Sequence, residues 1–169
     1  MDDAYLVLDR RIRKDLAVLE KLWEELEDAD LDAPEVDRKD LVYIGYNLNN
    51  LYNAAENIFR NIAGTFGNHL DAESGWHADL LDRMRLDLTP LRPAVLDGTT
   101  FDQLDELRRF RHVFRAAYSV ELDAERMALA LRKGLALRGH LPRQIEGFLA
   151  FLESLDTCRG GTGRRCRSF

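Results

Sequence analysis

The amino-acid sequence predicts an all-α protein, an up-and-down bundle of four to five helices. Apolar residues recur at intervals of three and four through most of the chain, and no segment alternates apolar and polar residues over a useful length. With 169 residues, 46% hydrophobic and 32% charged, the chain suits one ordinary domain with one core. We therefore expect a single helical domain over residues 1–155 and a flexible basic tail over residues 156–169.

Two long helices are expected first. The spacing of Ile12, Leu16, Leu19 and Trp23 marks one apolar face of a helix from about residue 3 to residue 30, before Pro34 breaks the pattern. The same period from position 41 to position 62 predicts a second long helix, which the glycines at positions 64 and 67 end.

Three further helices complete the bundle. A short one spans about 73–87, and two prolines follow it at positions 90 and 93. Thr100 is the candidate N-cap of the fourth helix, because Gln103 stands at capping-box spacing, and this helix should end near Tyr118. A fifth covers about 122–153 and is expected to kink between Gly139 and Pro142.

Charge and composition exclude several classes of function. The net charge is −6, so the protein should not coat nucleic acid nonspecifically, and any RNA or DNA site must be local. Cys158 and Cys166 both lie in the last twelve residues, and the four histidines are scattered singly, so we expect no metal and no cofactor. No apolar run approaches the roughly 20 residues that cross a bilayer, and the first residues are acidic, so we expect a cytoplasmic protein without membrane contact.

The densest basic stretch outside the tail lies on the fourth helix. At about 100° per residue, four side chains at intervals of three, four and three fall on one stripe: Arg108, Arg111, Arg115 and Tyr118. Guanidinium groups grip phosphate bidentately and can stabilise a pentacoordinate phosphorane, and a tyrosine ring can stack on a base. The default interpretation of these clustered arginines is a solvated helix face.

The segment from Leu107 to Tyr118 resembles the signature region of HEPN-domain proteins, specifically the HepT-like toxins of HEPN–MNT toxin–antitoxin pairs. That signature is an Arg, often followed by Asn, Asp or His, then a His after four intervening residues, and a Tyr two residues later. Arg111, His112 and Tyr118 match, whereas Ala116 stands where the His belongs. Residues 73–84, 92–95 and 118–123 resemble the same branch, and the likeness covers most of residues 1–155.

The resemblance implies a HEPN-like bundle and the toxin component of a type VII toxin–antitoxin system. It implies a metal-independent endoribonuclease, with tRNA as one candidate target, in which Arg111 holds the scissile phosphate and a His transfers a proton around the 2′-hydroxyl, leaving a 2′,3′-cyclic phosphate. Arg108 and Arg115 would bind RNA. It also implies a homodimer, and a higher hetero-oligomer with an MNT nucleotidyltransferase antitoxin that adds AMP to Tyr118.

Ala116 changes this expectation, because a methyl group can neither take nor give a proton. The chain as written should belong to an endoribonuclease family and be catalytically inactive, through deliberate inactivation or as a natural, degenerate member. His112 could in principle substitute for the missing histidine, but only three residues separate it from Arg108, short of the family spacing.

Two other functions stay open at this stage. A non-catalytic helical module would use the arginine stripe to bind nucleotide or RNA. A purely structural bundle would instead tie that stripe up in salt bridges with the acidic first helix. Trp76 and His77 are expected to pack the short third helix, and the asparagines between positions 47 and 61 are expected on a wet or interhelical face, with a dimer seam as the alternative.

Overall fold

The computed structural model describes residues 3–29, 31, 36–66, 75–116 and 123–160. Within these ranges the chain forms helices joined by turns, with one isolated bridge between Leu88 and Arg92 and no strand. The helices are α1 (Asp3–Glu27), α2 (Arg38–Thr65), α3 (Trp76–Arg85), α4 (Gly98–Ala116), α5 (Ala124–Leu137) and α6 (Leu141–Gly160). The predicted all-α class is confirmed.

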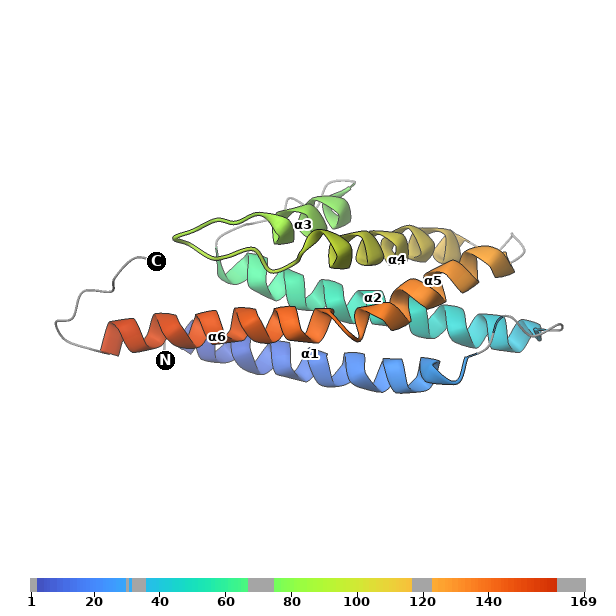
Figure 1. The fold of residues 1–169 in the computed structure, drawn as a ribbon, viewed down its shortest axis with the longest axis horizontal. Coiled ribbons are helices and arrows are strands. Elements are labelled where there is room, and N and C mark those ends of the chain that lie inside the picture. The colour runs from blue at the N-terminus through green and yellow to red at the C-terminus, as the bar shows by residue number, and fades with distance from the viewer. Residues whose placement is uncertain (1–2, 30, 32–35, 67–74, 117–122, 161–169) are drawn as a thin grey trace.

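The long helices run up and down (Figure 1). α1 and α2 lie antiparallel, α6 lies beside α1, and the short α3 sits next to α4. Their apolar faces meet in one core, and the indole of Trp23 in that core donates a hydrogen bond of 2.8 Å to the carbonyl of Gly134, which ties α1 to α5. No helix in the described part of the chain is both long and apolar enough to cross a membrane.

The expected fifth helix is two helices. α5 ends at Leu137, and the N–H groups of Arg138, Gly139 and His140 bond the carbonyls three residues back, which tightens the turn. Pro142 then stands in the first turn of α6, where its missing N–H costs nothing. α6 continues past residue 155 to Gly160, and residues 161–169 of the expected tail lie outside the described residues.

The N-cap of α4 is Asp97, so the prediction of Thr100 is wrong. The Asp97 carboxylate accepts a hydrogen bond of 2.7 Å from the backbone N–H of Thr100, and this bond lowers the pKa of Asp97. Thr100 is buried inside the first turn, where its hydroxyl accepts 2.8 Å from the Gln144 amide of α6. Asp at N-cap is as favourable as Ser or Thr, so local sequence alone does not choose between positions 97 and 100.

A buried arginine fixes the connection from α3 to α4. Arg92 is fully buried, and its guanidinium donates to three backbone carbonyls, those of Arg83 at 2.7 Å, Pro93 at 3.0 Å and Leu86 at 3.2 Å. Burial lowers the pKa of Arg92. Two of these carbonyls, those of Arg83 and Leu86, belong to the C-terminal end of α3, so Arg92 ties the connecting segment to that end.

Candidate functional site

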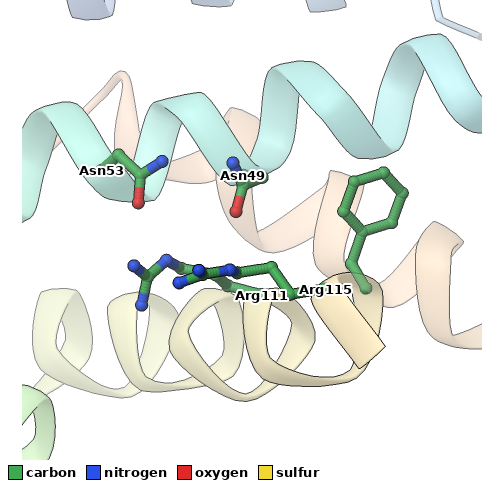
Figure 2. Close-up of a pocket in the computed structure, with 5 residues that line it drawn as sticks. Asn49, Asn53, Arg111 and Arg115 are labelled. Carbon is green, nitrogen blue, oxygen red and sulfur yellow. The ribbon is translucent and has the colours of Figure 1, made fainter. Parts of the chain in front are cut away.

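Two arginines of α4 face two asparagines of α2 across a pocket of about 600 Å³. Arg111, Phe114 and Arg115 line one side, and Asn49 and Asn53 line the other. Figure 2 shows both guanidinium groups lying between the helices, alongside the two amides. The pocket therefore combines two permanent positive charges with neutral groups that can donate or accept hydrogen bonds.

The end of α4 is brought close to α2 by a glycine. A methyl group built on Gly45 would lie 2.3 Å from Cε2 of the Phe114 ring, so only a residue without Cβ permits this approach. The aromatic rings of Phe110 and Phe114 stack on each other with centroids 5.6 Å apart. Together these contacts set the position of the adjacent Arg111 and Arg115.

Arg111 is held from two sides. Its Nη1 lies 3.5 Å from Nε2 of His77, which comes from α3, and its guanidinium carbon lies 5.7 Å from the ring centre of Tyr52 in α2. Its Nε is buried and has no hydrogen-bond partner among the described residues. Part of the donor fork of Arg111 is thus anchored, and part is unused.

Behind Arg111 lies a buried carboxylate, Glu56, which is 6% exposed. Its Oε1 forms a short contact with Nδ1 of His77, and its side chain also accepts a hydrogen bond from Tyr52. Burial, and then the charge of Glu56, raise the pKa of Tyr52 well above its ordinary value, so its hydroxyl stays protonated. The indole of Trp76 lies against the imidazole of His77, with ring centroids 3.7 Å apart and the ring planes tilted by 31°.

Arg108 of the stripe, and Arg109 beside it, are paired within α4. Nε of Arg108 lies 2.8 Å from Asp105, and Nη2 of Arg109 lies 2.6 Å from the same carboxylate. Acids of α1 make their ion pairs elsewhere, with Arg13 and Arg138. The purely structural alternative predicted salt bridges from the arginine stripe to the first helix, and these pairings do not support it.

The predicted site residues fall into three groups. Arg111 and Arg115 share the pocket, and Arg108 is close enough for its charge to act on the pKa of Tyr52. His112 is exposed and does not line the pocket. Ala116 is the last residue of α4, and Tyr118 lies outside the described residues.

Sequence reasoning missed the part of the site that α2 and α3 contribute. We expected Trp76 and His77 to pack α3, because nothing of complementary chemistry surrounds them in sequence. Trp76 does pack against the core, but His77 contacts Glu56 and Arg111, which are 21 and 34 positions away. The asparagines of α2 have two different roles. Asn57 donates a hydrogen bond of 2.7 Å to Asp15 of α1, as expected for an interhelical face. Asn49 and Asn53 instead line the pocket.

In chemical terms the arrangement suits an anion. The site presents guanidinium groups next to neutral amides, and among the described residues no carboxylate forms an ion pair with Arg111 or Arg115. Across the same described ranges, no three His, Cys, Asp or Glu side chains come together in a group that could hold a metal ion. A phosphate of RNA is an anion that guanidinium binds well.

Comparison with known families agrees with the signature on α4. A family model described as HepT-like protein matches residues 43–152, from α2 into α6, and so includes every residue that lines the pocket. No curated protein and no solved structure matches the chain. Since the match spans more than half of the sequence, the chain belongs to the HepT-like family, a family of HEPN toxin type.

Proposed function

We propose that this protein is the toxin component of a HEPN–MNT type VII toxin–antitoxin system, and that its Arg111 pocket binds the phosphate backbone of RNA. The observation that carries the proposal is the placement of Arg111 and Arg115 together in one pocket with the amides of Asn49 and Asn53. A local cluster of unneutralised guanidinium groups lets a protein of net charge −6 bind RNA at one place.

The proposed reaction is metal-independent cleavage by internal transfer. The 2′-oxygen attacks the neighbouring phosphorus, the bond from phosphorus to the 5′-oxygen breaks, and a 2′,3′-cyclic phosphate and a 5′-hydroxyl result. One proton leaves the 2′-hydroxyl for a base, and one proton reaches the departing 5′-oxygen. Arg111 stabilises the extra negative charge on the phosphorane.

Position 116 decides whether the proton transfers occur. It lies five residues after Arg111, about 140° around the helix, so a histidine there would approach the phosphate from a neighbouring face or across a dimer. A positioned acid–base group contributes roughly 10²- to 10⁴-fold to the rate. Ala116 supplies none, so the chain as written should bind RNA and cleave it very slowly.

One feature supports the proposed homodimer. Several apolar side chains of α2 and α4 near the contact between Gly45 and Phe114 are exposed, namely Val42, Tyr43, Tyr46 and Val113. A dimer that covers them would bring two copies of α4 together and double the local positive charge. An antitoxin that adds AMP to Tyr118, just beyond α4, would place bulk and negative charge beside this cleft and repel RNA.

The test is cleavage of total tRNA by the chain as written and by Ala116→His, both in EDTA, followed by analysis of the RNA ends. We expect the histidine form to cut and leave cyclic phosphates, at a rate about 10²- to 10⁴-fold above the alanine form. Arg111→Ala in the histidine form is the matched control and should abolish cutting.

A non-catalytic HEPN-like module that binds RNA or nucleotide is the second candidate, because Ala116 removes the proton donor. It predicts that neither form cuts while both remain folded and bind tRNA. That result would contradict the nuclease assignment.

A further inference from the structure

Three helices contribute to one chain of contacts that ends at Arg111. Glu56 of α2 contacts Nδ1 of His77 in α3, and Nε2 of the same imidazole lies 3.5 Å from Nη1 of Arg111 in α4. We propose that Glu56 and His77 form a relay that orients the guanidinium of Arg111 for the RNA phosphate. This inference rests on the proposed function and makes His77 a positioning residue.

The chemistry of Arg111 assigns the donor and the acceptor of each hydrogen bond in the proposed relay. A guanidinium carries donors and no acceptor, so in the proposed relay Nε2 of His77 accepts from Nη1 of Arg111. The imidazole then carries its proton on Nδ1, which donates to the Glu56 carboxylate. In this relay Glu56 sets the tautomer of His77, and His77 sets the position of Nη1 of Arg111.

Neighbouring rings hold the relay in place. The indole of Trp76 lies against the imidazole, and the guanidinium of Arg60 lies 5.4 Å from the centre of the Trp76 ring. Tyr52 lies next to the guanidinium of Arg111 and also bonds to Glu56. An arginine whose rotamer is fixed before the ligand arrives loses less conformational entropy when it binds, which strengthens binding.

The imidazole also separates the carboxylate from the arginine. A direct bidentate pair between a carboxylate and Arg111 would occupy the donors that a phosphate needs and would cancel the positive charge. Here the imidazole of His77 stands between them, and Nε of Arg111 keeps its hydrogen unpaired among the described residues. The relay therefore orients Arg111 and leaves its charge available to RNA.

The burial of Glu56 gives independent support. A carboxylate that is 6% exposed is costly unless its hydrogen bonds are satisfied, and both of its partners, Tyr52 and His77, contact Arg111 in turn. A carboxylate that served only the packing of α3 would not need both partners to meet the same arginine.

The test is the affinity for fluorescently labelled total tRNA, measured on the full chain with Ala116 in place so that cleavage does not interfere. His77→Leu removes both hydrogen bonds and should weaken binding about 3- to 10-fold, as the loss of one positioning bond predicts. His77→Gln keeps an acceptor and a donor on one side chain and should stay within about twofold of the unchanged chain. His140→Leu changes an exposed histidine at the turn before α6 and is the matched control.

A second readout separates positioning from proton transfer. In the Ala116→His background, tRNA cleavage by His77→Gln should be retained, and cleavage by His77→Leu should fall by a similar factor to its binding. If His77→Leu does not fold, as judged by its melting curve, His77→Asn takes its place, because the shorter amide cannot span both partners and should weaken binding too.

Two results would overturn the relay. Unchanged tRNA affinity in folded His77→Leu or His77→Asn would show that Arg111 needs no positioning. Equal loss in His77→Gln and His77→Leu would show that hydrogen bonding by itself is not what His77 contributes. Arg111→Ala distinguishes these failures from failure of the site, since unchanged affinity in that variant would remove the proposed RNA pocket altogether.

Discussion

Phe114 of α4 packs on the backbone of Gly45 in α2, so closely that a methyl group at position 45 would lie 2.3 Å from the ring. Phe114 precedes Arg115 and lines the pocket with it. The absence of a side chain at Gly45 therefore sets how near the arginines of α4 come to the asparagines of α2.

Gly45→Ala should displace Phe114 and disturb the pocket. We expect overpacking to cost about 1–3 kcal/mol, offset by about 1 kcal/mol of helix propensity, and tRNA affinity to fall as the arginines move. Gly64→Ala is the matched control, because it lies in the same helix with open space around the added methyl, and it should stabilise by up to about 1 kcal/mol. Chemical denaturation measures both, and equal stability changes in the two variants would contradict the close contact.

Arg92→Met should destabilise the protein strongly. The substitution removes the side-chain donor of three carbonyls, two at the end of α3 and that of Pro93 in the connection, at a cost of about 3 kcal/mol or more. Arg126→Met removes an exposed pair with Asp123 and should change stability by less than about 0.5 kcal/mol. Urea denaturation compares the two variants, and a small effect at position 92 would mean that other groups close α3.

Asp97→Ala should destabilise by about 1 kcal/mol at pH 7, because α4 loses its N-cap. The backbone N–H of Thr100 lowers the pKa of Asp97 in the folded state, so this stabilisation is present above the unfolded pKa and is lost as the pH falls through the folded pKa. The difference between the two proteins should therefore shrink in acid.

Asp97→Asn separates the cap from its charge. Asparagine caps helices about as well as aspartate, so its stability at pH 7 should lie within a few tenths of a kcal/mol of the unchanged chain. Urea denaturation at pH 7 and pH 3 measures all three proteins. A gap between Asp97→Ala and the unchanged chain that grows in acid would contradict the assigned cap.

Local pattern predicted the helices well, because a helix has the same period wherever it lies. The apolar spacing of Ile12, Leu19 and Trp23 predicted α1, and all three are buried in the core. The split between α5 and α6 was visible only as a kink, since Pro142 is compatible with both a bent helix and the first turn of a new one.

The site was predictable only on α4. Arg111 and Arg115 carry a motif within one helix, and their stripe follows from helical geometry. His77 and Glu56 reach Arg111 through tertiary packing from α3 and α2, and no period in the sequence joins positions 56, 77 and 111. The Trp76-His77 dipeptide was a signal visible in the sequence, whereas its partners Glu56 and Arg111 could not be identified there.

The most direct test of the RNA pocket is the salt dependence of tRNA binding by the chain and by the double variant Arg111→Ala/Arg115→Ala. For the double variant we expect weaker binding and a plot of log affinity against log salt that is shallower by about 1.4 to 1.8. Each lost phosphate contact contributes about 0.7 on a single strand and about 0.9 on a duplex. The double variant Arg126→Ala/Arg132→Ala removes the same charge from exposed positions of α5 and should leave the slope nearly unchanged. Equal affinity and slope in all three proteins would contradict the account.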